Sequence, residues 1–459
     1  MMSVNGQNAE QEEFRVALVL PWSRMVLVDK HGETNRLPRI SIPKQFRVAE
    51  QLTGVLQAIW AVRLIVLDLL PKSEELPSCA VIEVRGLESR VLPEGLMAVS
   101  VEDVTAQDLT QLERSTVRSI LAGDPQDRGP FSRVGWIEEA QAWIRESVVD
   151  RDVEFNGNIQ QLSAGRSSAL VCFETMDGPT YWLKATSGRN THELSTTRLL
   201  SRYCPQCLPP FIAARADWNA WITEEAGQPL YDALSFNAFE QATHCLAELQ
   251  LTSAAQVEDL LACGCFDQRM PILRSHLPAT MQYLEDAMAR QTSTKVPPLS
   301  TIRLRELRRL IEEATFALEA LGIPDALVHN DLNPGNILVD GTRAVFTDWS
   351  EACIGCPFLT FRNLQVQAFE ADETQTWARR IREIYKKHWE ACLSESQIER
   401  AFALSPPLAI VSYLCGRDPS FTSMHRGLDS VQSYARSLAR HLDRFAQYPE
   451  FLEALCSYV

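Results

Sequence analysis

The sequence lacks the features of a membrane or exported protein. No apolar run reaches the ~18 residues that a membrane-spanning helix needs. Residues 1–14 are polar and acidic, whereas a signal peptide begins with basic and then apolar residues. No membrane partner is therefore expected, and the cytoplasm is the expected location.

An excess of positive charge is also missing. The chain has 44 lysine and arginine residues against 59 aspartate and glutamate residues, which gives a formal net charge of −15. A nucleic-acid-binding protein would carry a basic surface, so no nucleic-acid partner is expected. The sequence shows neither an internal repeat nor a low-complexity segment, and a length of 459 residues with 46% hydrophobic residues indicates two or three folded domains.

The 12 cysteines are expected to be reduced thiols in the cytoplasm. Three pairs lie close in the sequence: Cys204 and Cys207, Cys353 and Cys356, and Cys263 and Cys265. Two of these pairs would form a four-thiolate zinc site if they met in space. Their leucine, proline and phenylalanine neighbours favour the alternative, in which the cysteines are small buried hydrophobic residues.

Residues 1–150 are expected to form a small α+β domain. Apolar runs predict strands in RVALVLP, RMVLVD, RLIVLDLL and SCAVIEVRG. Apolar residues at helical spacing predict helices in QFRVAEQLTGVLQAIWAV and AQDLTQLERSTVRSILAG. A further predicted helix, WIEEAQAWIRESV, links this domain to the next one, and the boundary is placed near residue 150.

The rest of the chain divides into a strand-rich part and a helical part. Residues 151–228 alternate between strands, turns and one helix. Residues 229–459 are nearly all helical, with amphipathic runs such as FNAFEQATHCLAELQLTSAAQ and IRLRELRRLIEEATFALEAL. The exception is NILVDGTRAVFTDW, which predicts a β-hairpin that turns at Asp340 and Gly341.

The stretch LVHNDLNPGNILV, residues 327–339, has the order of a phosphoryl-transfer loop. It places Asp331 and Asn336 in the pattern His-x-Asp-x-x-x-x-Asn, in which the aspartate is the base and the asparagine a metal ligand. The predicted hairpin returns Asp348 to the same place, and Mg²⁺ prefers such oxygen ligands. Alternatively, the asparagines form turns and Asp348 caps a helix that begins at Trp349. The agreement of several parts favours phosphoryl transfer.

Groups that bind the phosphates of ATP are expected upstream of this loop. In QLSAGRSSALVCFE, small residues between two strands, Gly165 among them, offer main-chain amides to phosphates. Lys184 in the strand YWLKAT is the candidate phosphate ligand, and Glu193 on the following helix is its candidate partner. The alternatives are a solvated strand lysine and an acid that the helix dipole favours at the start of a helix.

The stretch ITEEAGQPL, residues 222–230, joins the strand-rich part to the helical part. In a kinase this crossover presents main-chain amide and carbonyl groups to the adenine ring. The main chain at Glu225 and Ala226 is therefore the candidate adenine contact, and the side chains there are incidental.

These motifs, in this order, resemble the aminoglycoside phosphotransferase and choline kinase-like family, whose members are small-molecule kinases with the protein-kinase fold. The resemblance covers about residues 155–440, and its most specific segments are LVHNDLNPGNILV and VFTDWSEACIGCPF. These are close to the family patterns His-Gly-Asp-x-x-Pro-x-Asn and Ile-Asp-Trp-x-x-Ala. The resemblance implies a bilobal α+β fold, with a small β-rich N-lobe in residues 151–228 and a mostly helical C-lobe in residues 229–459.

The resemblance also implies roles for individual residues. Asp331 corresponds to the catalytic base, and Asn336 and Asp348 correspond to the magnesium ligands. Lys184 corresponds to the phosphate-binding lysine, and Ser167 and Ser168 lie in the nucleotide loop.

Three positions depart from the family pattern. Asn330 stands where the family usually has glycine, Asn333 where histidine is frequent, and Thr360 near the position of a further aspartate. None of these changes removes a group that the transfer step requires. They bear on the substrate class more than on the activity.

The order of strands and helices in residues 1–150 is loosely similar to a Nudix fold. The catalytic helix of that fold needs a cluster of glutamates for metal, and the helix QFRVAEQLTGVLQAIWAV offers only Glu50. Hydrolysis is therefore not expected of this domain. Docking, regulation and the formation of a homodimer stay open as its roles.

Two functions are compatible with these observations. The first is an ATP- and Mg-dependent kinase that phosphorylates a hydroxyl of a small molecule, and the second is a catalytically silent kinase-like module that binds nucleotide or regulates. The presence of the base, the metal ligands and the lysine favours the enzyme. Glu285, Asp286 and Asp267 are candidates to receive a cationic acceptor, although a solvated helix face explains them better.

Overall fold

The structure is a computed structural model of the whole chain. It describes residues 11–30, 34–44, 47–73, 76–86, 92–123, 129–149, 153–416 and 429–456. The chain divides into two compact units, the first made of Met1–Leu194 with Pro210–Glu225 and the second of Ser195–Pro209 with Ala226–Val459. The domain boundary predicted near residue 150 falls inside the first unit, and residues 150–152 lie outside the described ones. The division into three domains stays a prediction.

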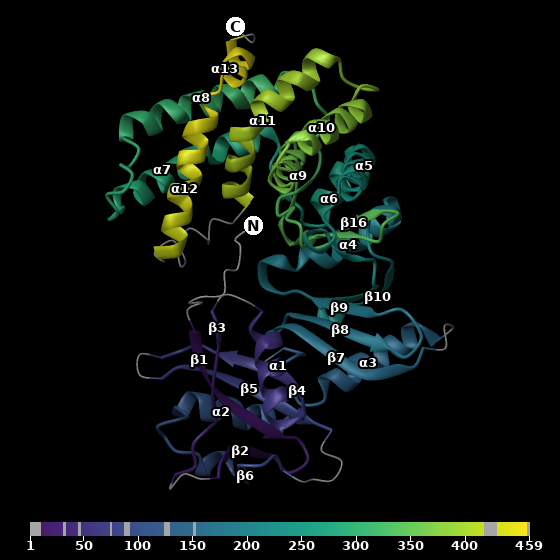
Figure 1. Cartoon of the computed structure of the whole chain (residues 1–459), viewed down its shortest axis with the longest axis vertical. Helices are drawn as coiled ribbons and strands as arrows, with labels where there is room; N and C mark the ends of the chain where they lie inside the picture. The colour runs from purple at the N-terminus through teal and green to yellow at the C-terminus, as the bar shows by residue number, and fades with distance from the viewer. Residues whose placement is uncertain are drawn as a thin grey trace. The chain divides into compact units, whose positions relative to one another are not determined.

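A mixed six-stranded sheet forms the N-terminal half of the first unit (Figure 1). Its strands are β1 (Gln11–Leu20), β2 (Met25–Asp29), β3 (Arg39–Pro43), β4 (Arg63–Leu70), β5 (Ser78–Arg85) and β6 (Leu96–Val99). The strand order is β4-β5-β1-β2-β6, and β3 also pairs with β1. β1 runs parallel to β5, whereas the other pairs are antiparallel. The four strands predicted from apolar runs are therefore present as β1, β2, β4 and β5.

Helices cover both faces of this sheet because β1 is apolar on both sides. Val16 and Leu18 belong to the core that contains residues of α1 (Val48–Trp60). Ala17 and Val19, which alternate with them, belong to the core that contains residues of two other helices. These helices are α2 (Gln111–Ala122) and α3 (Trp136–Ser147).

An antiparallel five-stranded sheet completes the first unit. Its strands, in the order β10-β11-β9-β8-β7, are β10 (Phe211–Arg215), β11 (Ala220–Glu224), β9 (Tyr181–Ala185), β8 (Ala169–Thr175) and β7 (Phe155–Ala164). Phe173, Tyr181 and Ile222 of this sheet share one hydrophobic core with Trp136 of α3 and Val19 of the first sheet. The first unit therefore has a core that spans residues from both sides of position 150.

The second unit is mostly helical. Its helices are α5 (Phe236–Ser253), α6 (Val257–Ala262), α7 (Met270–Ala289), α8 (Thr301–Glu319), α9 (Pro357–Ala371), α10 (Thr376–Trp389), α11 (Glu395–Gly416), α12 (Asp429–Phe445) and α13 (Pro449–Cys456), and α4 (His192–Tyr203) enters it from the first unit. The predicted amphipathic runs form α5 and α8, which begin at capping serines, Ser235 and Ser300.

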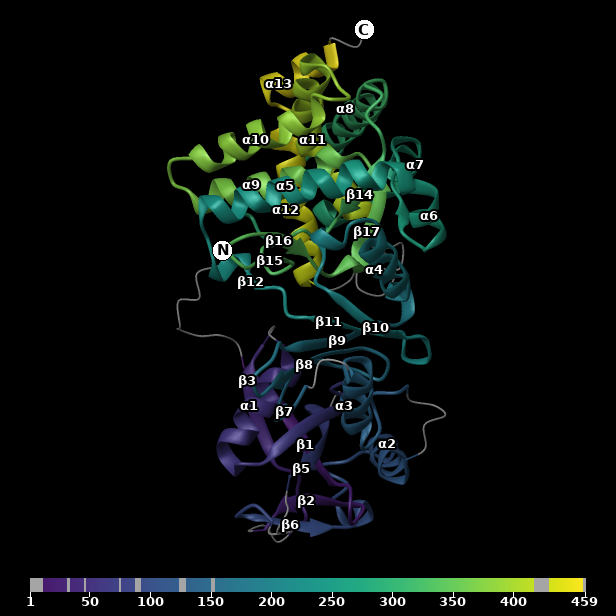
Figure 2. The same ribbon diagram turned by 90° about the vertical axis from the view of Figure 1, so that its right-hand side faces the viewer.

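Two small three-stranded sheets lie among these helices. One has the order β12-β15-β16 and consists of Gln228–Pro229, Ile337–Val339 and Ala344–Phe346; the other has the order β13-β17-β14 and consists of Phe266–Asp267, Ala352–Gly355 and Ala326–His329. Figure 2 shows β14 beside α5. The loops that follow β14 and β16 carry the residues of the candidate site.

The fold is thus mixed α+β, with a sheet-rich N-terminal part and a helical C-terminal part, as predicted. The separate Nudix-like domain predicted for residues 1–150 is not confirmed. Among the described helices, none combines the length and the apolar character needed to cross a membrane.

Candidate active site

The loop after β14 holds Asp331 in a fixed position. The main-chain N–H of Asn333 donates to the Asp331 carbonyl oxygen at 2.9 Å. The side-chain Nδ2 atoms of Asn333 and Asn336 lie 3.3 and 3.4 Å from Oδ2 of Asp331, and Asn336 Nδ2 also donates to the Asp331 carbonyl oxygen at 2.8 Å. Two asparagines of this turn therefore orient the Asp331 carboxylate, which is half-buried.

The predicted β-hairpin brings Asp348 back toward this loop. β15 and β16 pair antiparallel, with Ile337 opposite Phe346. The main-chain N–H of Thr347 donates to the carbonyl oxygen of Asn336 at 3.0 Å. Asp348 therefore follows a residue that is bonded directly to Asn336.

The backbone of Asp348 adopts a left-handed conformation, with φ of 65°. This conformation costs free energy for a residue other than glycine, and it is common at functional sites. Asp348 precedes a short 3-10 helix, Trp349–Glu351, but its side chain makes no capping hydrogen bond to that helix. It accepts a hydrogen bond from Ser350 Oγ at 2.8 Å instead. The capping role weighed as an alternative is therefore not what the structure shows.

His329, two residues before Asp331, contacts the residues on either side of Asp348. Its side chain is buried, and Nε2 lies 2.8 Å from the carbonyl oxygen of Thr347. Its ring packs against Trp349 with centroids 4.6 Å apart. The histidine of the motif therefore ties the end of β14 to the residue that precedes Asp348.

Asn336 and Asp348 offer oxygen atoms of the kind that Mg²⁺ binds. Because Nδ2 of Asn336 is engaged by Asp331, its Oδ1 lies on the opposite side of the planar amide. Magnesium takes one or two such protein ligands and completes its shell with phosphate oxygens and water. Within the described residues, no group of three or more His, Cys, Asp or Glu side chains could hold a metal. The donor set fits a cation that is also held by phosphates.

Lys184 and Glu193 form an ion pair in the first unit. Nζ of Lys184, on β9, lies 2.6 Å from Oε1 of Glu193, near the start of α4. The Glu193 side chain is completely buried, and that of Lys184 is 21% exposed. Lys184 also lies 5.8 Å from the ring centroid of Trp221 on the neighbouring strand. An acid placed only by the helix dipole would not need burial against a lysine, so the pairing predicted between these residues is present.

The candidate nucleotide loop connects β7 to β8 and contains Gly165, Ser167 and Ser168. Ala164 pairs with Ala169, so the connection is a tight four-residue turn. A Cβ atom at Gly165 would lie 2.7 Å from Ser168 Oγ, so a larger residue there would require the Ser168 side chain to turn away.

Residues from the N-terminal half of the first unit hold this loop. Nε of Arg166 pairs with Oδ2 of Asp68 at 3.1 Å, and the Arg166 carbonyl oxygen accepts from the N–H of Phe131 at 3.3 Å. The buried side chain of Gln161 bonds the main chain of Val66 twice, at 2.8 and 2.9 Å. Sequence reasoning missed these contacts because each joins residues far apart in the chain.

The structure divides the chain between Glu225 and Ala226, in the predicted crossover. Glu225 donates its N–H to the carbonyl oxygen of Thr180 at 2.9 Å and accepts from Nε1 of Trp182 at 2.6 Å. Ala226 is buried in the second unit. A Cβ at Gly227 would lie 2.3 Å from the Val339 carbonyl oxygen, so glycine is needed where this segment meets β15.

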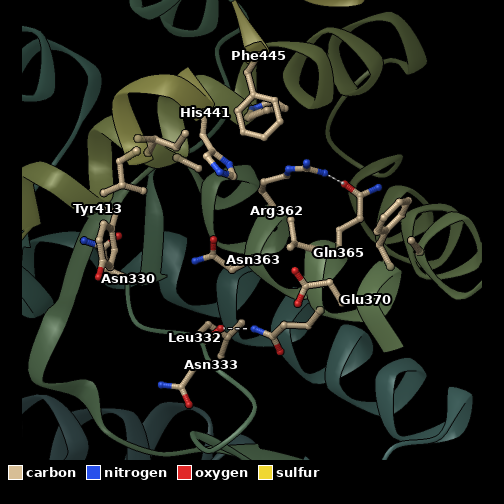
Figure 3. A pocket seen from close by; sticks show the side chains of 18 of the residues that line it. Asn330, Leu332, Asn333, Arg362, Asn363, Gln365, Glu370, Tyr413, His441 and Phe445 are labelled. Carbon is tan, nitrogen blue, oxygen red and sulfur yellow. Dashed lines mark hydrogen bonds between the residues drawn. The ribbon is translucent and has the colours of Figure 1, made fainter. Parts of the chain in front are cut away.

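A cavity of about 860 Å³ opens beside Asp331 in the second unit (Figure 3). The loop after β14 forms one wall, and α9 to α12 supply most of the others. Figure 3 shows the side chains of Arg362, Asn363 and Gln365 of α9 in its lining, with His441 and Phe445 of α12 close to Arg362. None of these five residues was predicted from the sequence. For the three on α9 the signal was polar side chains in a largely apolar helix.

Asn330, the first departure from the family pattern, is buried at the edge of this cavity. Its Nδ2 donates to the carbonyl oxygen of Ser412 on α11 at 3.3 Å. Asn330 therefore ties the loop after β14 to the helix that supplies Tyr413 to the cavity. Asn333 is exposed, and Thr360 is buried in α9.

The three acids considered for a cationic acceptor lie elsewhere. Asp267 pairs with Arg269 at 2.6 Å. Glu285 and Asp286 are on α7, where Asp286 accepts from Gln282 at 3.0 Å. The described residues that line the cavity include none of the three.

The cysteines of both C-x-x-C pairs are buried in the hydrophobic interior: Cys204, Cys207, Cys353 and Cys356. Burial raises the pKa of Cys204 to about 11 and that of Cys356 to about 12. The structure thus agrees with their interpretation as buried hydrophobic residues.

The model of the phosphotransferase enzyme family matches residues 202–393, which include Asp331, Asn336 and Asp348. Lys184 and Glu193 precede the matched segment. A comparison with curated proteins found no match.

Several solved structures are similar to the chain at low sequence identity. One is a choline/ethanolamine kinase family protein from Mesorhizobium loti, at 14% identity, 70% coverage of this chain, 98% of that chain and a TM-score of 0.45. Another is an ethanolamine kinase from Plasmodium vivax, at 16% identity, with 71% of this chain and 91% of that chain covered and a TM-score of 0.44. A third is the macrolide 2'-phosphotransferase MphH from Brachybacterium faecium, at 15% identity, with 65% of this chain and 97% of that chain covered and a TM-score of 0.42. Over residues 202–393 the chain resembles the phosphotransferase enzyme family, as its motifs predicted.

Proposed function

We propose that this protein is a small-molecule kinase that transfers the γ-phosphate of ATP to a hydroxyl group. Asp331 is the base, and Asn336 and Asp348 hold Mg²⁺. Bound magnesium would neutralise charge on the phosphates. The observation that carries the proposal is that Asn336 bonds Asp331 through its side chain and the residue before Asp348 through its main chain, inside the segment that matches a phosphotransferase family.

Groups of the first unit would bind the nucleotide. Lys184, oriented by Glu193, is suited to pair with phosphate oxygens. The remaining candidates are Gly165, Ser167 and Ser168 for the phosphates, and the main chain of Glu225 and Ala226 for the adenine. These assignments follow the order in which a kinase sequence carries its phosphate-binding loop, lysine, glutamate and adenine-binding crossover.

In the proposed reaction the acceptor hydroxyl oxygen forms a bond to the γ-phosphorus while the bond from that phosphorus to the β-γ bridging oxygen breaks. ADP leaves with the electron pair, and the hydroxyl proton passes to the carboxylate of Asp331. The two asparagine amides keep that carboxylate aimed in one direction before the acceptor arrives. Such positioning supplies a large share of the rate in phosphoryl transfer.

The test is a screen of small hydroxylated compounds with Mg-ATP, with the product detected as a mass increase of one phosphate. Asp331→Asn keeps the size of the side chain but removes the base, so we expect turnover to fall by about 10²-fold or more. Nucleotide binding, followed by thermal shift, should change by less than twofold. Asp286→Asn, at an exposed position of α7, is the matched control.

Two results would overturn the proposal. One is an Asp331→Asn variant that phosphorylates the acceptor at the wild-type rate. The other is nucleotide binding without any product across the screen, which would favour the silent kinase-like module.

A further inference from the structure

The cavity beside Asp331 carries charge opposite to that of the whole chain. The chain has a formal net charge of −15. The described residues that line the cavity include four arginines, Arg362, Arg379, Arg382 and Arg444, with His441 as well. Against them stand two carboxylates, Asp331 and Glu370. Because Asp331 is assigned to the hydroxyl group, Glu370 alone is left to balance the arginines.

Not all of these arginines can offer their charge to a ligand, because one is already paired with a carboxylate of the protein. Arg382 forms an ion pair with Glu399, so its charge is largely neutralised within the protein. Arg362, Arg379 and Arg444 form no ion pair with any carboxylate in the described part of the chain. Arg379 and Arg444 are exposed, whereas Arg362 is partly buried in the cavity wall.

Arg362 is the most informative of the three. Its Nη1 donates to Oε1 of Gln365 at 3.0 Å, and its Nε is enclosed without a hydrogen-bond partner among the described residues. Burial lowers the pKa of this guanidinium from its ordinary value. A cation kept partly out of water without a counter-ion is costly unless a ligand supplies the negative charge.

The wall around Arg362 adds polar and aromatic contacts. Asn363 projects into the cavity next to it (Figure 3). The ring of Phe445 lies 5.4 Å from the Arg362 guanidinium carbon, and Tyr413 and Tyr434 line the same cavity. A ligand that fits these groups has an anionic end and an apolar or aromatic body.

We propose that the acceptor of this kinase is an anionic hydroxy compound whose carboxylate or phosphate group binds Arg362 while its hydroxyl faces Asp331. This inference rests on the proposed function, since it assigns the acceptor to the cavity beside the base. The cationic acceptor considered from the sequence would meet repulsion from three unpaired arginines and attraction from Glu370 alone.

The test compares matched acceptors on the same scaffolds. Each hydroxylated aliphatic or aromatic scaffold is supplied in four forms: as the carboxylate, the phosphate ester, the neutral amide and the cationic amine. Phosphorylated product is measured with Mg-ATP, and acceptor binding is measured separately by calorimetry without nucleotide. We expect an anionic form to give the lowest KM. Comparison of the carboxylate with the phosphate ester then identifies which of the two anionic groups the acceptor carries.

Arg362→Gln removes the charge and keeps hydrogen-bonding capacity. We expect it to raise the KM of the anionic acceptor by about tenfold or more, as loss of a charged hydrogen bond does. The KM of ATP and the weak binding of the neutral amides should stay within twofold. Arg362→Lys should recover part of the affinity, and Arg305→Gln, at an exposed position of α8, is the matched control.

Failure of this inference is distinguishable from failure of the proposed function. Tighter binding of the amines than of the anionic forms, or an Arg362→Gln variant that weakens neutral and anionic forms equally, would overturn the inference and leave the kinase intact. Binding of an anionic form that depends on Arg362, without any product, would support the anion site and overturn the kinase. If Arg362→Gln does not fold, the comparison of anionic, neutral and cationic forms with the wild-type enzyme still decides the inference.

Discussion

Among single residues, Glu193 is expected to control how Lys184 meets the nucleotide. Its carboxylate is fully buried and lies 2.6 Å from the ammonium group. Glu193→Gln keeps the side-chain volume but removes the charge that orients Lys184, so the lysine loses its fixed direction. We expect the KM of ATP to rise by about tenfold, roughly the loss of one charged hydrogen bond. Steady-state kinetics at varied ATP and saturating acceptor measure it.

Asp177→Asn is the control for this change, since Asp177 is an exposed acid between β8 and β9. It should leave the KM of ATP unchanged. A Glu193→Gln enzyme with the wild-type KM for ATP would contradict the role given to the ion pair. Glu193 would then be only an acid that the helix dipole favours at the start of α4.

The residues of the candidate site differ in how well the sequence could predict them. Asp331, Asn336 and Asp348 could be nominated from the sequence because only one loop and one hairpin separate them, so their spacing constrains their geometry; their roles as base and metal ligands stay a prediction. Arg362 could not be predicted, because it lines the cavity beside Asp331 from α9, and the position of that helix depends on tertiary packing. Asn330 was noticed only as a departure, and its bond to Ser412 on α11 depends on a contact 82 residues away.

Among the elements, β7 is held by the N-terminal half of its own unit, and this should matter for nucleotide binding. Gln161 bonds both the N–H and the carbonyl oxygen of Val66 from a buried position. Gln161→Ala removes both bonds and leaves the main chain of Val66 unsatisfied. We expect a loss of about 1–3 kcal/mol in the free energy of unfolding of the first unit. Because the same strand leads into the loop with Gly165, the KM of ATP should rise as well.

Gln160→Ala is a closely matched control. Gln160 precedes Gln161 on the same strand, but its side chain is exposed and bonds Glu50 at 2.7 Å. Chemical denaturation and ATP kinetics of the two variants should therefore differ. Equal effects of both changes would show that the buried contact with Val66 does not hold the loop.

The elements themselves were largely predictable, whereas their grouping was not. Periodicity located α1, α2, α3, α5 and α8 because each buries one apolar face. The apolar runs of β1 and β5 likewise indicated strands. What periodicity does not encode is which layers share a core, so the core that joins Trp136 to Phe173 could not be read from the sequence, and the boundary near residue 150 stays a prediction.

For the whole molecule, the separate cores of the two units predict separate responses to core mutations. Trp136 is fully buried in the first unit, with its ring 5.1 Å from that of Phe131, and Phe361 is fully buried in the second unit, stacked on Tyr385 at 4.1 Å. Trp136→Ala and Phe361→Ala should each cost about 3–5 kcal/mol in the unit that contains it. Differential scanning calorimetry should show two transitions, with each variant lowering the midpoint of a different one by roughly 10 °C. A single transition that both variants shift by the same amount would mean that the two units unfold as one, and the separate cores would not define separate folding units.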